Sequence, residues 1–343
     1  MRDRESTAPP HADGAGTLQE WEKTMQSIRV ARPGGAAELR YTETATPVPA
    51  EGQVLVRNAA VGVNFTDVYY RDGTYPLQAP FTPGQEAAGV VAAVGAGVTG
   101  FAPGAPVAYA TQLGAYAEYT LAEQDRLIPL PDGVDPVLAA TVTLQGLAAY
   151  YLTHQTHPVA EGETVVVLAA AGGLGSLLVQ LAAARGATVI AVASTAEKEK
   201  TARAAGARHT LGYDGFDEAV LELTGGRGAR VVYDSVGAPT YRASLRSLGR
   251  RGLLALCGAS GGAVASVDVE TLRGGSLFVT RPAMKDYLYD AATLRTAGSA
   301  VFRHLADGVL RPHVHAELPL RDAEQAHRLL ESRATTGKLL LIP

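Results

Sequence analysis

The feature that most constrains the fold is the stretch LAAAGGLGSLLVQLA, residues 168–182, in which glycines separate two apolar segments. It continues the apolar run TVVVLA, residues 164–169, which has the length and composition of a buried strand. A strand that ends at Ala169 and a helix that begins near Gly173 place the glycines in a strand-to-helix turn. In such a turn, backbone N–H groups at the positive end of the helix approach a pyrophosphate. The stretch therefore predicts a dinucleotide-binding site.

The glycine pattern itself is incomplete. The three glycine positions of G-x-G-x-x-G correspond to Ala170, Gly172 and Gly175, so the first glycine is replaced. The alternative is that the glycines only let a helix pack closely against a sheet. The alternation of strands and helices around the motif favours the dinucleotide, because the motif is informative mainly in that setting.

Two different patterns divide the chain. From about residue 26 to 147, short apolar runs are broken by glycine and proline, which is typical of a compact β-rich domain. From residue 161, apolar strands alternate with helices, which indicates a parallel sheet covered on both faces. After residue 278 we expect a helix over 291–306, a strand, a helix with Asp322 as its N-cap and the terminal strand KLLLIP. We expect this tail to pack back on the first domain.

Composition narrows the class of protein. A chain of 343 residues with 47% hydrophobic and 19% charged residues suits two globular domains. The net charge of −4, without a cluster of Lys and Arg in the sequence, argues against a nucleic-acid partner. A single cysteine, Cys257, and no apolar leader or long apolar span predict a cytoplasmic protein without a membrane segment. Residues 1–24 mix proline, glycine and charges, so we expect a flexible N-terminal arm.

The end of the second expected strand indicates which dinucleotide binds. An NAD site usually has an acidic residue there, on the ribose 2′-hydroxyl. This chain has Ser194 and Thr195, followed by Lys198, and this pattern suits the 2′-phosphate of NADPH. Glu197 and Glu199 weaken the argument, and the alternative is that Lys198 is a solvated helix residue paired with them.

The sequence holds few candidate metal ligands. It has one cysteine and eight histidines, and no group of them has the spacing of a structural zinc site. His313 and His315 would share one face of a strand, but no third ligand accompanies them. We therefore predict no bound metal, and any hydride transfer is expected to be metal-free.

Six ordered motifs resemble a known family. They are VGVNFTDVYYRDGTYP (61–76), PGQEAAGVVAAVGAGV (83–98), AAAGGLGSLLVQLA (169–182), VVYDSVG (231–237), SLFVTRP (276–282) and LLESRATTGKLLLIP (329–343). Together they resemble the quinone oxidoreductase, or zeta-crystallin-like, branch of the medium-chain dehydrogenase/reductase superfamily. The resemblance implies a GroES-like catalytic domain formed by residues 25–148 and 287–343, and a Rossmann NADPH-binding domain formed by 149–286. It also implies a homodimer, joined edge to edge through the Rossmann sheets.

The resemblance also assigns site residues. It places Lys198, Tyr213 and Arg333 around the 2′-phosphate, near which the local sequence already placed Ser194. It places along the remaining cofactor Gly172, Gly173, Leu174, Gly175, Ser235, Gly258, Phe278 and Val279. Asn64 and Tyr69 would approach the nicotinamide and the substrate as catalytic residues. Zinc-dependent relatives carry Cys and His where this chain has Asn64 and Gln85, which agrees with the small number of candidate ligands.

The expected activity is transfer of a hydride from NADPH to a conjugated carbonyl acceptor, with a quinone as the first candidate. Asn64, Tyr69 and Arg281 are the candidate donors to the carbonyl oxygen. One alternative is reduction of an enone or enoyl thioester in biosynthesis. Another is a non-catalytic protein that binds NADPH and acts as a lens-type crystallin or an RNA-binding protein.

Overall fold

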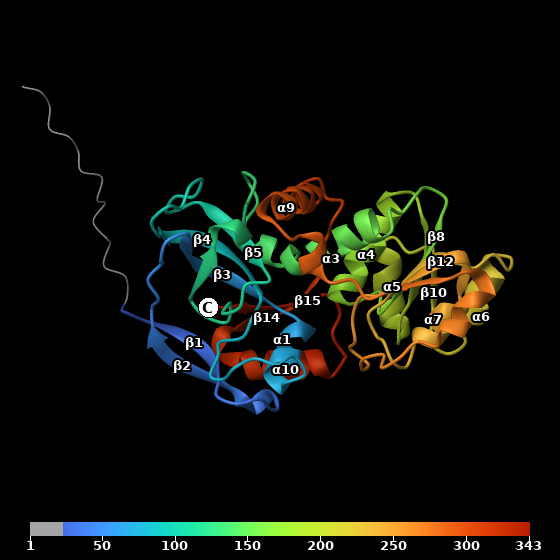
Figure 1. The fold of residues 1–343 in the computed structure, drawn as a ribbon, viewed down its shortest axis with the longest axis horizontal. Helices are drawn as coiled ribbons and strands as arrows, with labels where there is room; N and C mark the ends of the chain where they lie inside the picture. Colours follow the sequence, from blue (N-terminus) through green and yellow to red (C-terminus); the bar gives the residue numbers. More distant parts are fainter. Residues whose placement is uncertain (1–22) are drawn as a thin grey trace, which may run out of the picture.

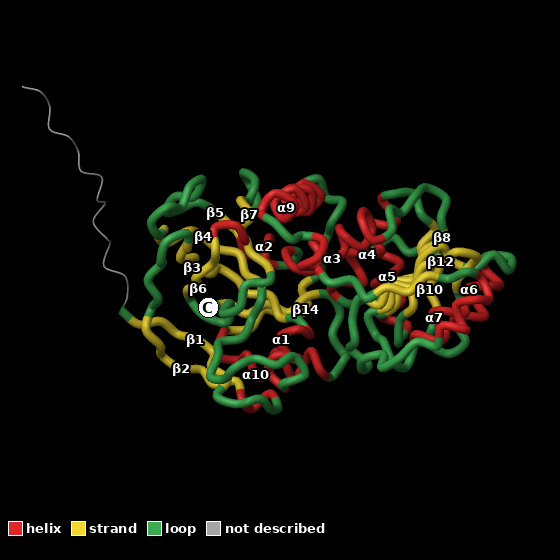
Figure 2. The backbone as a smooth tube through the Cα atoms, viewed as in Figure 1, coloured by secondary structure: helices red, strands yellow, loops and turns green. Residues whose placement is uncertain are grey.

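The computed structural model describes residues 23–343, and the expected N-terminal arm, residues 1–24, lies almost entirely outside them. The described chain forms two lobes side by side, each built around its own sheet (Figure 1). Figure 2 shows the strands of the two lobes as separate groups with helices between them. The expected combination of a parallel-sheet domain and a β-rich domain is therefore confirmed.

The sheet of the Rossmann lobe has the order β10-β9-β8-β11-β12-β13, and every pair in it is parallel. Its strands are β8 (Thr164–Leu168), β9 (Thr188–Val192), β10 (His209–Leu211), β11 (Ala229–Asp234), β12 (Leu248–Leu256) and β13 (Phe278–Thr280). The chain builds outward from β8 on one side and then returns to add β11 on the other. The carboxyl end of β8 therefore lies at the point where the strand order reverses, which is where such sheets bind ligands.

Helices cover both faces of this sheet. They are α4 (Gly173–Ala184), α5 (Ala196–Ala204), α6 (Phe216–Leu223) and α7 (Tyr241–Arg246). The residues of β8 alternate between the two layers: Val165 and Val167 join one hydrophobic cluster, while Val166 and Leu168 join another. This double burial explains why the strand reads as a continuous apolar run.

The β-rich lobe contains a sheet of order β14-β15-β3-β4-β5-β7, with β6 also paired to β3. Its strands are β3 (Gln53–Val63), β4 (Glu86–Val94), β5 (Pro106–Ala110), β6 (Tyr119–Glu123), β7 (Leu127–Pro129), β14 (Val314–Pro319) and β15 (Lys338–Ile342). A second, two-stranded sheet joins β1 (Thr24–Val30) and β2 (Leu39–Ala45). The terminal strand β15 runs antiparallel to β3, so the prediction that the tail returns to the first domain is confirmed.

Two helices of this lobe matter for the site. Helix α1 (Phe65–Asp72) follows β3 directly, and α10 (Ala323–Glu331) precedes the C-terminal strand. The prediction that Asp322 is the N-cap residue of α10 is confirmed; it also ends a 3₁₀ turn, Leu320–Asp322, and its side chain makes no cap bond within the described structure. The tight turn already leads the chain into the helix, so a side-chain cap bond is not needed there.

A shared core joins the two lobes. Helix α3 (Thr143–Tyr151) lies between them, with α2 (Pro136–Ala140) before it and α9 (Ala291–Ala306) packed against it (Figure 1). Leu147 of α3, Leu178 of α4 and Val301 of α9 are buried in one cluster. The predicted boundaries after residues 148 and 286 fall inside α3 and the short helix α8 (Met284–Tyr287), and they stay predictions. No helix within residues 23–343 is both long enough and apolar enough to cross a bilayer.

Candidate active site

The glycine turn leaves β8 and enters α4. Ala169 adopts a left-handed conformation, φ 49°, and its carbonyl oxygen accepts a hydrogen bond of 2.9 Å from Gly172 N. A Cβ on Gly175 would collide with this same oxygen, so the protein itself requires glycine at that position. A Cβ on Gly172 would lie 3.2 Å from it, a contact that a small shift relieves. The fold itself therefore requires glycine at position 175 but not at position 172.

The first amides of α4 are available to a ligand. Gly172 is the N-cap residue, and among the described residues no side chain caps the helix. The first helical bond runs from Ser176 N to Gly172 O, 2.8 Å, so the amides of Gly173, Leu174 and Gly175 precede it. With the helix dipole they form a positive site that suits a pyrophosphate.

Beyond the turn, the structure brings Lys198 and Arg333 together. Lys198 Nζ donates to Arg333 O, 2.5 Å, although the two residues are 135 positions apart. Arg333 Nη2 donates to Ser260 O, 2.8 Å, so its guanidinium lies over the Rossmann lobe. Tyr213 lies beside the turn, and its hydroxyl accepts from Ala169 N, 3.1 Å. Partial burial of Lys198 lowers the pKa of its ammonium.

The two glutamates beside Lys198 are engaged elsewhere. Glu197 is 80% exposed and pairs with Lys200 at 3.6 Å. Glu199 accepts from the Thr210 hydroxyl, 2.9 Å. Neither forms an ion pair with Lys198 in the described structure, so the alternative of Lys198 as a paired surface residue is not favoured. Ser194 is exposed at the end of β9, and no carboxylate stands in its place.

Four other predicted cofactor residues lie on the far half of the sheet. Ser235 follows β11 and Gly258 follows β12, and a Cβ on Gly258 would lie 2.6 Å from Ser235 O. These two strand ends therefore pack closely. Phe278 and Val279 lie on the edge strand β13, where Phe278 is 53% exposed. Their contacts with a cofactor stay predictions.

Asn64 is buried and its carboxamide is fully engaged. It is 5% exposed and immediately precedes α1. Its Nδ2 donates to Glu86 Oε1, 2.7 Å, and to Gly62 O, 3.4 Å. Its Oδ1 accepts from Lys338 Nζ and from Gln145 Nε2, each at 3.1 Å. The amide that the sequence offered as a donor to substrate is committed to protein partners.

The Tyr69 hydroxyl, unlike the Asn64 carboxamide, is not committed to protein partners. It is buried, and the O–H has no acceptor among the described residues. Burial raises the pKa of this hydroxyl, and the nearby Arg281 and the backbone of Ala259 lower it in part. Arg281 itself donates to Leu256 O, 2.7 Å. Tyr69 therefore extends from α1 toward the Rossmann segment that carries Ala259 and Arg281, with an unused donor.

Family models match most of the described chain in two parts. The alcohol dehydrogenase GroES-like domain matches residues 50–132, and the zinc-binding dehydrogenase family matches residues 173–294. The quinone oxidoreductase of Pseudomonas aeruginosa is 42% identical over 323 residues, covering 92% of this chain and 99% of that protein. The chain belongs to the quinone oxidoreductase family of the medium-chain dehydrogenase/reductase superfamily.

Other members of this family are similarly close. The 2-haloacrylate reductase of a Burkholderia species is 41% identical over 325 residues, covering 92% of this chain and 98% of that protein. The structure of the Escherichia coli quinone oxidoreductase complexed with NADPH matches with a TM-score of 0.90 and 41% identity, covering 93% of this chain and all of that one. The family predicted from the six motifs is confirmed.

The family model is named for zinc, but the residues of this chain do not fit a zinc ion. Lys338 is 1% exposed and forms an ion pair with Glu86, 0% exposed, directly beside Asn64. A cationic ammonium thus already occupies the donor groups next to Asn64. The described residues include no group of three or more His, Cys, Asp or Glu placed to hold a metal. The side chains around Asn64 therefore form an ion pair instead of a zinc site.

Sequence reasoning missed the segment between Arg333 and Lys338. Gly337 N donates to Ala171 O, 2.8 Å, and Gly337 forms a bridge with Gly172. The segment therefore runs from the Lys198 contact, past the glycine turn, to Asn64. Within the family motif ESRATTGK, Arg333, Gly337 and Lys338 contact Lys198, the glycine turn and Asn64 respectively. The one local signal in the sequence is the glycine at position 337, because glycine permits the positive φ of 65° that the chain adopts there.

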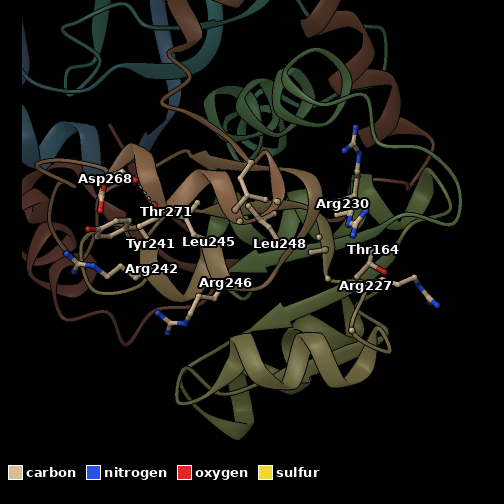
Figure 3. A pocket seen from close by; sticks show the side chains of 18 of the residues that line it. Thr164, Arg227, Arg230, Tyr241, Arg242, Leu245, Arg246, Leu248, Asp268 and Thr271 are labelled. Carbon is tan, nitrogen blue, oxygen red and sulfur yellow. Dashed lines mark hydrogen bonds between the residues drawn. The ribbon is translucent and has the colours of Figure 1, made fainter.

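A hollow of about 1080 Å³ lies elsewhere, at the amino ends of β8, β11 and β12 (Figure 3). Five arginines line it, Arg227, Arg230, Arg242, Arg246 and Arg250. The sequence did not reveal this grouping because the arginines are spread over α7, β11, β12 and the turn before β11. Arg242 and Arg246 lie at one end and Arg227 at the other, and Arg246 binds Asp217 at 2.6 Å. The hollow is separate from the glycine turn, and its arginines do not converge on one point.

Proposed function

We propose that the protein transfers a hydride from NADPH to a conjugated carbonyl acceptor, with a quinone as the first candidate. Bound NADPH supplies the hydride. The observation that carries the proposal is the sequence of groups along the site: free amides at the start of α4, then Lys198 and Arg333, with no carboxylate at Ser194. The E. coli relative, whose structure is described as a complex with NADPH, supports the same cofactor.

Tyr69 is the hydrogen-bond donor to the acceptor in this proposal. Hydride addition leaves negative charge on the acceptor oxygen, and a preorganised donor beside that oxygen stabilises the transition state. The raised pKa of Tyr69 keeps the proton on its hydroxyl at neutral pH. Arg281 contributes positive charge nearby, while its Nη1 holds the Leu256 carbonyl.

Asn64 is a positioning residue in this proposal, not a donor to substrate. Both of its N–H groups are directed at Glu86 and Gly62, and reorienting them would leave the buried carboxylate of Glu86 short of a partner. This differs from the catalytic role that the resemblance implied for it. Its role is to hold Glu86, Gln145 and Lys338 in place through its hydrogen bonds.

Aromatic rings favour a flat acceptor. Tyr75 packs edge-on against Tyr69, with ring centroids 5.2 Å apart, and against Tyr70, 5.5 Å apart. A second candidate is an activated carbon–carbon double bond bearing a carboxylate, as the name of the Burkholderia 2-haloacrylate reductase suggests. Arg281 would then bind the carboxylate. No observation favours a purely structural or RNA-binding role.

The proposed assembly is a homodimer in the cytoplasm. Among residues 23–343, strand β13 pairs only with β12, so its other edge is available to another strand. Phe278 on this strand is 53% exposed and Val269 before it is 73% exposed. We propose that two copies join here to continue the sheet.

The test is consumption of NADPH and of NADH with three acceptor classes: quinones, enones and 2-haloacrylates. We expect turnover with NADPH and quinones, and weaker turnover with NADH. Equal use of the two cofactors would contradict the phosphate site. Tight NADPH binding without oxidation by any acceptor would instead support a non-catalytic protein.

A further inference from the structure

Gln145 carries an unexplained polar atom. It lies on α3, and its Nε2 donates to Asn64 Oδ1 at 3.1 Å. Its Oε1 is buried and has no hydrogen-bond partner among the described residues. A Cβ built on Gly173 would collide with this oxygen. A free acceptor of the β-rich half of the chain therefore lies directly over the first residue of α4.

The direction of the Gln145 amide is fixed by charges. The Glu86 carboxylate only accepts, so Asn64 must turn its Nδ2 toward Glu86 and its Oδ1 away. The Lys338 ammonium only donates, and it binds that Oδ1. Gln145 must then offer Nε2 to the same oxygen, because the reverse orientation would place two acceptors against each other. The buried ion pair thus forces Oε1 to face the glycine turn.

A buried acceptor without a partner is unfavourable, and native proteins rarely keep one unless a ligand or water supplies the donor. A pyrophosphate at α4 offers only acceptors near neutral pH, so it does not satisfy Gln145. The nicotinamide half of NADPH carries suitable donors, the ribose hydroxyls and the carboxamide N–H₂. Gly173 lies at the start of the predicted pyrophosphate site, within reach of that half.

We propose that Gln145 binds the cofactor, accepting a hydrogen bond from the nicotinamide half of NADPH, and that Lys338 and Glu86 are positioning residues that set its direction. This inference rests on the proposed use of NADPH. It adds a contact that neither the glycine motif nor Lys198 and Arg333 provide. It also gives the buried ion pair of Lys338 and Glu86 a role in cofactor binding.

The test measures dissociation constants by calorimetry for three ligands: adenosine 2′,5′-bisphosphate, 2′-phospho-ADP-ribose and NADPH. The first contains only the phosphorylated adenosine end, the second adds the pyrophosphate and second ribose, and the third adds the base. The variant is Gln145→Leu, which keeps the size of the side chain and removes its polar atoms. Gln53→Leu is the matched control, because Gln53 bonds Glu123 on the surface of the β-rich lobe.

We expect Gln145→Leu to weaken NADPH about 3- to 10-fold, the range for one hydrogen bond, without changing the affinity for the bisphosphate. If 2′-phospho-ADP-ribose weakens equally, the donor is a ribose hydroxyl; if only NADPH weakens, it is the carboxamide. Unchanged NADPH affinity, or an equal loss for all three ligands, would overturn the proposal. Failure of the wild-type protein to bind any of them would overturn the proposed function instead.

The positioning role has its own test. The double variant Lys338→Met with Glu86→Gln removes both charges, so the direction of the Asn64 amide is no longer imposed. We expect it to weaken NADPH in the wild-type background and to add little in the Gln145→Leu background, because the two changes act through one bond. Fully additive losses would show that the ion pair acts independently of Gln145. If the double variant does not fold, the single variant still decides the cofactor contact.

Discussion

Two buried polar networks meet at the start of α1, and they end differently. The first surrounds Asn64, where Lys338, Glu86 and Gln145 are joined by hydrogen bonds. It lies against the glycine turn and ends on Gln145 Oε1, which has no partner among the described residues. We call it the open network.

The second network begins three residues later, at Asp67, and we call it the closed network. Tyr116 donates to Asp67 Oδ2, 3.2 Å, and accepts from His327 Nε2, 2.9 Å. Arg71 donates to His327 Nδ1, 3.1 Å, and binds Glu331 through two bonds of 2.8 Å. Arg71 is 2% exposed and Glu331 37% exposed, so this network ends in an ion pair that reaches solvent.

The difference separates stability from function. In both networks a cation that only donates fixes the direction of every bond. The closed network also holds one buried oxygen without a partner among the described residues, Asp67 Oδ1. Its hydrogen bonds join α1 to Tyr116 and to α10, so its contribution is to hold these parts of the β-rich lobe together. The open network leaves one acceptor toward the turn, which is useful only if a ligand completes it. Substitutions in the two networks should therefore differ in which property they change.

The largest expected effect is on stability, from Lys338→Met. This substitution leaves Glu86 buried and without its cation, which costs about 3–5 kcal/mol in comparable proteins. Arg71→Met should cost less, because Glu331 is 37% exposed and water can replace the lost partner. Denaturant unfolding of both variants measures the difference. An Arg71→Met loss as large as that of Lys338→Met would contradict the contrast between a buried and a solvent-reaching pair.

The next effect separates two tyrosines. Tyr69→Phe removes a hydroxyl without a partner, so the free energy of unfolding should not fall, while kcat should fall on the order of 100-fold through loss of the donor. Tyr116→Phe removes a hydroxyl with two partners, so it should lower stability by about 1–2 kcal/mol and change kcat little. Steady-state kinetics and denaturant unfolding on both variants provide the measurement. A stability loss in Tyr69→Phe would show that its hydroxyl already has a partner in the folded protein.

A smaller effect concerns a region outside both networks. Arg333→Ala should weaken NADPH by about 1.5 kcal/mol, the lower end for a charged hydrogen bond because the side chain is exposed, and should change NADH little. Fluorescence titration with both cofactors measures it. Arg328→Ala, which removes a surface pair with Glu324, is the control and should alter neither affinity. Equal losses for NADPH and NADH would contradict the 2′-phosphate assignment.

Parts of the site that depend on local sequence were predictable. The glycine turn follows from one strand and one helix that are adjacent in the chain, and Lys198 follows the end of the next strand. The positions of Asn64 and Tyr69 came from the resemblance, and their different bonding states did not. Whether an amide is free or committed depends on partners that the sequence does not mark.

The open network was not predictable for the same reason. Lys338 and Asn64 are 274 positions apart, and Gln145 and Asn64 are 81 apart. In the sequence, Lys338 is a charged residue at the start of a strand and Gln145 is an isolated polar residue, and such residues are usually exposed to solvent. Only the return of β15 to β3 brings the lysine into the interior.

The smallest effect in the wild-type protein is on the pH dependence of the free energy of unfolding. Asp67 and His327 of the closed network change it in opposite directions. Burial raises the pKa of Asp67 to about 7, so its contribution to stability is present below pH 4 and is lost as pH rises toward 7. Burial, together with Arg71, lowers the pKa of His327 to about 3, so its contribution is present above pH 6.5 and is lost as pH falls. Between about pH 4 and 6.5 the two slopes are opposite.

Asp67→Asn removes the contribution of Asp67 to the pH dependence of stability and leaves that of His327. Relative to wild type, the stability of this variant should rise with pH by about 1.4 kcal/mol per unit between about pH 4 and 6, the slope of one proton. Denaturant unfolding at several pH values measures the difference between the two proteins, in which groups common to both cancel. Asp290, an exposed cap residue of α9, gives the control Asp290→Asn, which should not produce that rising slope. A pH-independent difference for Asp67→Asn would mean that Asp67 is ionised in the folded protein, and the closed network would then hold a charge at its inner end as the open network does.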